Sequence, residues 1–437
     1  KEAKANTVSP KFFITEDLKY FISESSLNKS NYKKLLKKFD SEKELMDSFT
    51  SFLDDKIKSS MNMAVFINSN KSVTFEGVKL HLFYPSGSVL QEDKLFDENI
   101  FTIVQELPYV FKHEGKTRFS FRPDLSFFLN GIYLGYSELK SNWNNQTAGK
   151  NGRHKVMKDY LSATQEYLVI ADKNDISQTI RKDFLHIFEK AIHITATDLT
   201  DTFVIRNIAT FFDDIKATVS KGDYDFSDYE KKMVKDFKPY PLVNPNADKL
   251  ARFEEVFRAL YDKKMIEKEI LYYNFIEREL IKKEGSKTKE YKHNDGRLIS
   301  PRPKQKFGTD KVLAKVEEFL KHEQEPDYFI KKLETELRDK GIGEERVKEL
   351  VNKRLKYQNN KNVYSLLLHY AAGFGKSNII GWTALQLKDL RKNGEFIYDK
   401  VMLVVDRLQL RDQLDSKMHN MNIQKAMFIE ATDRKSF

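Results

Sequence analysis

The chain has 437 residues, with 75 Lys or Arg and 65 Asp or Glu, which give a formal net charge of +10 at pH 7. This length predicts two or three compact units, and the moderate basic bias is compatible with a polyanionic partner without identifying one. No Cys is present, which excludes disulfides and thiolate metal sites and leaves carboxylates and imidazoles as metal ligands. No apolar run approaches the roughly 20 residues that span a bilayer, and the N-terminus lacks a signal-peptide core, so we expect a cytoplasmic protein with no membrane association.

An amphipathic helix is predicted near the N-terminus, with a sheet after it. Ser41 is the expected N-cap of this helix, with Glu44 three residues further on. The apolar positions at helical spacing are Leu45, Phe49, Phe52 and Leu53. From residue 63 to residue 139 the sequence pattern changes to short β-rich runs at residues 64–67, 78–83 and 100–104, which are separated by Gly, Pro and Asn.

The clearest local unit lies between residues 118 and 140, where two β-rich runs flank Asn130-Gly131. Asn-Gly is the strongest short hairpin signal because both turn positions tolerate positive φ, so the two runs are expected to pair antiparallel. We expect next a helix through Tyr160, a strand over residues 167–170 and a strand near residues 203–205. The first domain is expected to comprise residues 1–237.

Three prolines, Pro239, Pro241 and Pro245, mark a boundary after this domain. A helical segment over residues 248–283 and a polar loop over residues 284–294 follow. We therefore expect a helical linker region over residues 238–300.

Residues 301–437 are expected to form a third unit, with a charged helical insertion at about residues 321–356 that is interrupted around residues 341–343. The final stretch alternates strand (363–369), Gly-rich turn, helix (376–390) and strand (401–405). This order is typical of a parallel sheet covered by helices. The chain as a whole is therefore predicted to be α/β.

A possible metal site lies at the open end of the hairpin. Alternate side chains of a strand share a face, so Glu138 and Lys140 project together, and the hairpin brings Asp124 near them. Mg²⁺ prefers oxygen ligands, so we predict that Asp124 and Glu138 bind it, with the carbonyl of Leu139 as a further candidate. Lys140 is predicted to orient or deprotonate a water that attacks a phosphodiester, or to stabilise the phosphate. The alternative is an ordinary salt bridge on a hairpin.

Residues 370–377 read Tyr-Ala-Ala-Gly-Phe-Gly-Lys-Ser, a phosphate-loop candidate with Tyr370 in place of the first Gly. Gly373 and Gly375 let backbone N–H groups approach phosphate, Lys376 can bridge the β- and γ-phosphates, and Ser377 can hold Mg²⁺. We therefore expect ATP to bind here. A simple Gly turn is the alternative.

Two further residues are candidates. Gln305 lies upstream of the phosphate loop, before a helix, in a setting where superfamily 2 helicases use a Gln to read adenine; a surface Gln is the alternative. Arg407 follows the last predicted strand and is similar in position to the helicase segment that contacts the DNA backbone. Asp406 and Arg407 are equally well interpreted as helix-capping and surface charges.

The order of these motifs resembles the N-terminal half of the R subunit of type I restriction enzymes. The hairpin with Asp124, Glu138 and Lys140 resembles the PD-(D/E)xK nuclease core, and residues 272–276 (Tyr-Tyr-Asn-Phe-Ile), 373–377 and 405–407 follow it in that family's order. The resemblance covers roughly residues 100–415. It implies a PD-(D/E)xK endonuclease-like domain followed by an incomplete RecA-like, superfamily 2 motor lobe.

By this resemblance the chain is expected to be part of an ATP-dependent, DNA-translocating endonuclease that cuts double-stranded DNA with Mg²⁺. Its partners would be methyltransferase and specificity subunits, in a bacterial or archaeal cytoplasm. The alternatives are another phage-defence nuclease–helicase fusion, such as a type III subunit, and a non-catalytic docking arm. Type III subunits usually place the nuclease after the motor, whereas here it comes first.

Some positions depart from the family pattern. Such nucleases often carry an acidic residue on the preceding helix, for which Glu44 competes with Glu42 and Asp47. A Gln and a Tyr one helical turn apart are common downstream; Tyr160 is present, but Val156 stands at the Gln position. Residues 321–356 lengthen the gap before the phosphate loop. The acidic ATPase box and the second motor lobe are expected beyond the end of this sequence, so we expect no ATP turnover by this chain alone.

Overall fold

The computed structural model describes residues 2–3, 13–86, 90–113, 116–173, 185–219, 227–242, 246–278, 280–282, 289–291, 296–357, 366–392, 395–405 and 408–421. Within these ranges, no helix combines the length and the apolar character that a membrane span requires.

Helices and strands occur in runs along the chain. The α-helices are α1 (Thr15–Glu24), α2 (Lys29–Leu36), α3 (Glu42–Ser59), α4 (Met63–Ser69), α5 (Leu90–Asp97), α6 (Arg153–Lys173), α7 (His186–Glu189), α8 (Phe212–Val219), α9 (Ser227–Asp236), α10 (Lys249–Tyr261), α11 (Lys263–Lys268), α12 (Pro303–Lys321), α13 (Pro326–Asp339), α14 (Glu344–Tyr357), α15 (Lys376–Lys388) and α16 (Leu408–Asn420). Short 3₁₀ turns are η2 (Asn142–Asn144) and η5 (Ile208–Phe211), and π-helical turns are η3 (Ala148–Gly152) and η6 (Glu269–Tyr273).

The strands are β1 (Glu2–Ala3), β2 (Ser72–Phe75), β3 (Val78–His81), β4 (Phe101–Gln105), β5 (Tyr109–His113), β6 (Lys116–Phe121), β7 (Leu125–Leu129), β8 (Ile132–Leu139), β9 (Ile194–Thr197), β10 (Thr202–Ile205), β11 (Lys238–Pro239), β12 (Phe275–Glu277), β13 (Leu280–Lys282), β14 (Lys289–Tyr291), β15 (Arg297–Ile299), β16 (Arg391–Lys392) and β17 (Glu395–Phe396).

A mixed seven-stranded sheet, in the order β1-β4-β7-β8-β9-β10-β11, forms the centre of the N-terminal part. Asn130 and Gly131 have φ values of 50° and 77°, so the predicted turn forms and β7 pairs antiparallel with β8. On its other side β8 pairs parallel with β9. The residues of β8 are buried from Ile132 to Glu138.

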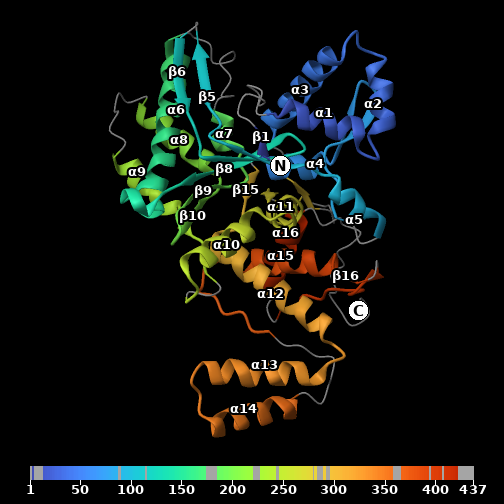
Figure 1. Ribbon diagram of the computed structural model, residues 1–437, viewed down its shortest axis with the longest axis vertical. Helices are drawn as coiled ribbons and strands as arrows, with labels where there is room; N and C mark the ends of the chain where they lie inside the picture. Colours follow the sequence, from blue (N-terminus) through green and yellow to red (C-terminus); the bar gives the residue numbers. More distant parts are fainter. Residues whose placement is uncertain are drawn as a thin grey trace.

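Helices cover both faces of this sheet. On one face, Phe188 of α7 contacts Tyr136 of β8 and Tyr160 of α6, with ring centroids 6.1 and 5.6 Å apart. On the other face, Tyr261 at the end of α10 stacks on Phe127 of β7 at 3.9 Å. Figure 1 shows α6, α8 and α9 together on one side of the molecule and α1, α2 and α3 on the other. The sheet therefore lies inside a layered α/β unit.

The N-terminal helices join the same core. Ser41 caps α3 as predicted, since its side chain accepts a hydrogen bond from the Glu44 N–H. The Ile14 N–H, at the start of α1, donates to the Gly131 carbonyl of the hairpin turn at 2.8 Å. A Cβ at Gly131 would lie 2.4 Å from the Ile14 carbonyl oxygen, so this turn needs glycine for its φ and for this close approach.

The C-terminal half packs below this unit. A buried ion pair joins the two: Arg206, which follows β10, contacts Glu269 of η6 at 2.6 Å. Helix α15 packs against α12 and α16 and carries the buried Trp382, which clusters with Leu414 and Met418 of α16. Helices α13 and α14 form a separate hairpin at the bottom of Figure 1, around a small apolar core of their own. The predicted charged helical insertion, with its break at residues 341–343, is thus confirmed as helical.

Two predicted elements are wrong, and a third is wrong in its last part. Residues 64–67 lie in helix α4, because the Asn62 side chain caps it by accepting from the Val65 N–H. Residues 167–170 continue helix α6 and do not form a strand; the helix brings Leu161 and Leu168 to the same buried side as Tyr160. The segment at 248–283 is helical to Tyr273, after which it forms β12 and β13.

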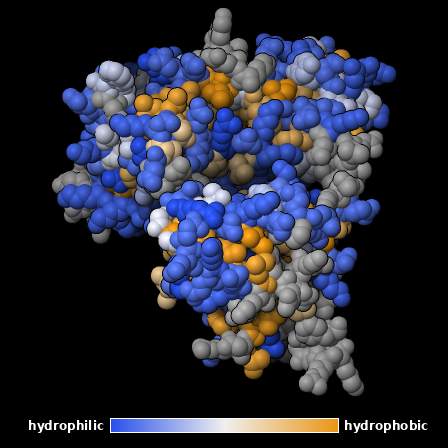
Figure 2. Space-filling model, turned by 60° about the horizontal axis from the view of Figure 1, so that its bottom comes forward, coloured by the Kyte–Doolittle hydropathy of each residue, from blue (hydrophilic) through white to orange (hydrophobic). Residues whose placement is uncertain are grey.

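The predicted parallel sheet of the C-terminal part does not form within residues 366–392, 395–405 and 408–421. Residues 401–405 and 366–369 have no strand conformation, and the strands assigned there, β16 and β17, pair antiparallel. An extended segment becomes a strand only when a neighbouring backbone pairs with it, and Leu367 is 95% exposed. In Figure 2 hydrophobic side chains gather on the lower part of the face shown. The α/β class is confirmed, whereas a RecA-like sheet is not.

Candidate active site

The open end of the β7–β8 hairpin brings the three predicted residues together. Leu125 pairs with Ser137, so the next residues along, Asp124 and Glu138, face each other on one side of the sheet. Asp124 Oδ2 accepts a hydrogen bond from the Leu139 N–H at 2.6 Å. Lys140 Nζ lies 2.6 Å from Glu138 Oε1. The structure therefore places Asp124 against the backbone of Leu139, next to the ion pair of Glu138 and Lys140.

The backbone around these residues is anchored on both sides. The Asp124 carbonyl accepts from the Glu106 N–H at 2.9 Å, and the Lys140 N–H donates to the Thr197 carbonyl at 2.8 Å. Gly152 lies against Lys140, since a Cβ there would be 3.3 Å from Lys140 Cγ. The strand ends therefore hold the side chains in a defined place.

Glu138 is a charged residue that is buried within the sheet. It is 2% exposed, and its second oxygen, Oε2, accepts from Lys155 Nζ of α6 at 2.7 Å. Each carboxylate oxygen thus has its own ammonium partner. Such pairing is what makes the burial of a charged carboxylate tolerable.

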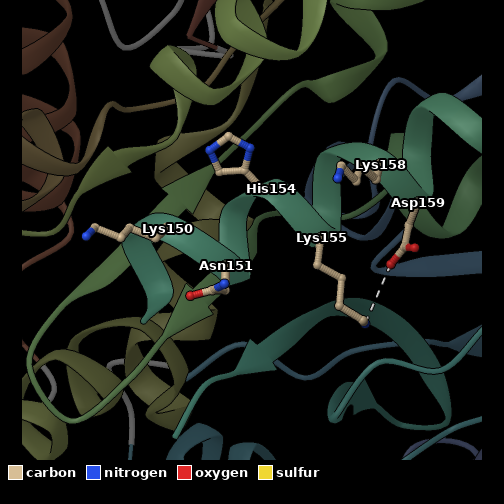
Figure 3. Close-up of a pocket in the computed structure, with 6 residues that line it drawn as sticks. All are labelled: Lys150, Asn151, His154, Lys155, Lys158 and Asp159. Carbon is tan, nitrogen blue, oxygen red and sulfur yellow. Dashed lines mark ion pairs between the residues drawn. The ribbon is translucent and has the colours of Figure 1, made fainter. Parts of the chain in front are cut away.

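Helix α6 contributes a third carboxylate to the cluster. Asp159 Oδ2 lies 3.6 Å from Lys155 Nζ, and Figure 3 shows both side chains on one side of the helix while His154 points to the other. Burial raises the pKa of Asp159 to about 6; Lys155 opposes this shift and the charge of Glu138 adds to it. Burial lowers the pKa of Lys155, but Glu138, Asp159 and Asp124 raise it by more, so this pKa lies above its ordinary value.

Sequence reasoning missed Lys155 and Asp159. The available signal was their spacing, because residues four apart on a helix lie on one face. Val156 is buried, and Tyr160, the other predicted helix position, is a core residue whose hydroxyl donates to Glu189 at 3.1 Å. The side of α6 that reaches Glu138 is therefore the one that carries Lys155.

The carboxylate oxygens at this site are suitable ligands for Mg²⁺, provided that the ion can displace an ammonium group. Asp124 and Glu138 offer carboxylate oxygens, and Mg²⁺ commonly takes one or two carboxylates and completes its shell with water and phosphate. Both Glu138 oxygens, however, are paired with lysines. Across the ranges described above, no group of three or more His, Asp and Glu side chains forms a ready-made metal cage. A cation at Glu138 would have to displace an ammonium.

The acidic candidates on α3 are engaged elsewhere. Glu42 contacts Lys19 at 2.6 Å and Tyr32 at 2.8 Å, and Glu44 accepts from the Asp40 N–H at 3.1 Å. Figure 1 places α3 on the opposite side of the molecule from α6. Asp47 lies on the same helix and is exposed. The structure does not bring these residues to the cluster at Glu138.

The phosphate-loop candidate has the predicted local form. Gly373 and Gly375 have φ values of 73° and 81°, a region that favours glycine, and Gly375 is the N-cap of α15. Lys376 Nζ donates to the carbonyls of Tyr370 and Ala371, at 3.2 and 3.0 Å. The chain thus curls around the lysine at a helix N-terminus, where Ser377 is the second residue.

Gln305 lies against this loop. Its Nε2 donates to the Phe374 carbonyl at 2.6 Å and its Oε1 accepts from the Arg302 N–H at 2.8 Å. It is 5% exposed, so the surface interpretation is wrong. A Cβ at Gly375 would lie 2.6 Å from Gln305 Nε2, which shows how closely α12 and the loop approach.

Asp406 and Arg407 lie outside the described residues. Neither a comparison with protein-family models nor a comparison with curated protein sequences finds a match for this chain. The geometry of the two sites therefore carries the functional proposal.

Proposed function

We propose that this chain is the nuclease-bearing part of an ATP-driven endonuclease that cuts double-stranded DNA with Mg²⁺, of the kind found in type I restriction enzymes. The single observation that carries the proposal is the convergence of Asp124, Glu138 and Lys140 at the open end of one hairpin. The phosphate loop with Gln305 against it supports the ATP-binding part. In this proposal the chain works with methyltransferase and specificity subunits.

The proposed chemistry assigns each side chain a task. Asp124 and Glu138 would hold Mg²⁺, which when bound supplies hydroxide at neutral pH and neutralises charge on the phosphate. Lys140 remains beside Glu138 and orients the attacking water or stabilises the developing charge. Lys155 balances the charge of Glu138 while no metal is present. Lys376 and Ser377 would contact the phosphates and Mg²⁺ of ATP, and Gln305 would stand beside them.

The test is cleavage of circular double-stranded DNA by the chain assembled with its methyltransferase and specificity subunits, in Mg²⁺ and ATP. Glu138→Gln and Lys140→Ala are each expected to reduce cleavage by at least roughly 100-fold, the usual effect of losing such a group, while the complex still hydrolyses ATP. Glu317→Gln, an exposed position on α12, is the control. Cleavage at the wild-type rate by either site variant would contradict the nuclease assignment. Lys376→Ala is expected to stop translocation and cutting together.

A second candidate function is a docking arm in which the cluster is only an ion-pair network. The pairing of both Glu138 oxygens with lysines favours it. Calorimetric titration of the chain with Mg²⁺ separates the two, because a nuclease site binds the ion and loses binding in Glu138→Gln, whereas an ion-pair network binds none. A nuclease–helicase fusion of another kind would share the same site; the order of nuclease before motor favours the type I arrangement.

A further inference from the structure

An exposed tryptophan lies beside the candidate active site. Trp143 is 92% exposed and stands three residues after Lys140, in the 3₁₀ turn η2. The second Trp of the chain, Trp382, is 0% exposed in the core of the C-terminal part. A large aromatic side chain normally buries most of its surface, so an exposed indole leaves its ring face open to a ligand.

The loop that carries Trp143 is short and held at both ends. Before it, the Lys140 N–H donates to the Thr197 carbonyl at 2.8 Å; after it, the Ala148 N–H donates to Asp198 Oδ2 at 2.7 Å. Thr197 is the last residue of β9, and Asp198 follows it. Within the loop, the Asn144 N–H donates to the Ser141 carbonyl at 3.1 Å. The backbone of Trp143 is therefore held near the end of β8.

A basic pocket follows the same loop. It has a volume of about 380 Å³ and is lined by Lys150, Asn151, His154, Lys155, Lys158 and Asp159, as Figure 3 shows. Lys155 also contacts Glu138, so this lysine belongs both to the lining of the pocket and to the cluster at Glu138. Residues 141–160 contain four Lys or Arg and one acidic residue. The charge of this segment suits a polyanion.

Two lysines of the pocket, Lys150 and Lys158, can bind a negatively charged ligand. Lys155 pairs with Glu138, and His154 contacts Glu230 at 2.8 Å. Lys150 and Lys158 are exposed, and among the residues that the structure places neither makes an ion pair. Exposed ammonium groups of this kind bind phosphate without reading sequence.

We propose that Trp143 and this pocket form a binding surface for a single DNA strand, with phosphates along Lys150 and Lys158 and one unpaired base stacked on the Trp143 indole. This inference rests on the proposed nuclease function for the nature of its ligand. Within a duplex the faces of the bases are covered by their neighbours, whereas an unpaired base offers its face to an aromatic ring. The surface would thus hold a locally opened strand beside Glu138 and Lys140.

The test uses the fluorescence emission of Trp143 to detect binding. In the Trp382→Phe chain, Trp143 is the only Trp, and a single-stranded oligonucleotide added in EDTA is expected to quench its emission. A blunt duplex of the same sequence is expected to quench it less. If Trp382→Phe does not fold, the same quenching is measured in the wild-type chain and must disappear in Trp143→Phe. Unchanged emission at saturating oligonucleotide would overturn the proposal.

Affinity measurements give the second readout. Trp143→Ala is expected to weaken single-strand binding roughly tenfold, the effect of one lost stacking contact. Lys150→Ala with Lys158→Ala is expected to weaken it further and to reduce its salt dependence. The controls are Tyr20→Ala, an exposed aromatic on α1, and Lys33→Ala with Lys37→Ala in the α2 region, which remove the same charge.

The outcomes separate this surface from the active site. Loss of cutting in Glu138→Gln together with wild-type binding by Trp143→Ala would refute the surface and leave the nuclease site standing. Weakened binding in Trp143→Ala together with wild-type cutting by Glu138→Gln would refute the nuclease site and leave the binding surface standing.

Discussion

The hairpin site and the phosphate loop are built in opposite ways. Asp124, Glu138 and Lys140 lie at the ends of two paired strands of a mixed sheet, with backbone hydrogen bonds to Glu106 and Thr197 on either side. The phosphate loop lies between a helix and residues 366–369, which have no strand conformation and are exposed. The first site is held by its sheet, whereas the second is held by its helix N-terminus and by Gln305.

The difference shows what each kind of motif needs. A glycine-rich loop is local: positive φ at two glycines and a helix start are enough to produce its shape. A two-carboxylate site needs residues from several elements in register, so it exists only when the sheet is formed. Substitutions that disturb the sheet should therefore damage the first site far more than the second.

The largest contrast is expected between two glycine substitutions. In Gly135→Ala the new Cβ would lie 2.4 Å from the His193 carbonyl oxygen, inside the sheet, whereas Gly373→Ala meets nothing within 4 Å and is strained only by its φ. We expect Gly135→Ala to destabilise the N-terminal part by about 3 kcal/mol, a fall in its thermal midpoint of roughly 6–12 °C. Gly373→Ala should add a local strain of about 1 kcal/mol and leave that midpoint in place. Calorimetry of both chains checks this, and equal midpoints would contradict it.

A smaller effect is expected from Asp159, and it depends on pH. Because burial raises its pKa from 3.8 to about 6, the folded chain binds more protons than the unfolded chain in this window, and the carboxyl lowers stability as the pH rises through it. Asp159→Asn removes this penalty. A shift of about two units corresponds to about 3 kcal/mol, and since a quarter of the side chain is exposed we expect about 2 kcal/mol of stabilisation at pH 8.

The same variant should differ little from the wild type at pH 4, where the native carboxyl is protonated. Urea unfolding at the two pH values measures the difference. A stabilisation of equal size at pH 4 and pH 8 would show that the carboxylate charge is not its cause.

The smallest effect is expected at the phosphate loop. Gln305→Ala removes the two hydrogen bonds that join α12 to Arg302 and Phe374, each contributing about 1 kcal/mol. The loop keeps its glycines and its lysine, so we expect nucleotide affinity to fall only about fivefold, corresponding to about 1 kcal/mol. Fluorescent nucleotide titration checks this against Gln409→Ala, an exposed position on α16. An unchanged nucleotide affinity in Gln305→Ala would show that Gln305 does not contribute to nucleotide binding.

Much of the hairpin site was predictable because short-range signals agreed. Asn130-Gly131 determines the turn and the pairing that follows, and alternation along β8 places Glu138 and Lys140 on one side. Lys155 and Asp159 were not predictable in this way, since which side of α6 meets Glu138 depends on how the helix packs. Residues 167–170 were misassigned for the same reason: β-branched and aromatic residues favour strands locally, but here they continue a helix whose buried side packs on the core.

Taken by itself, the sequence determined the features that a few neighbouring residues control: the hairpin turn, the Ser41 cap, the two left-handed glycines of the phosphate-loop candidate and the α/β class. Only the tertiary structure decided that two lysines share Glu138, that Gln305 reaches Phe374, and that residues 401–405 have no strand conformation. The physical reason is that turns and caps depend on local φ and hydrogen bonds. Buried ion pairs and sheets depend instead on partners far along the chain, which only packing brings together.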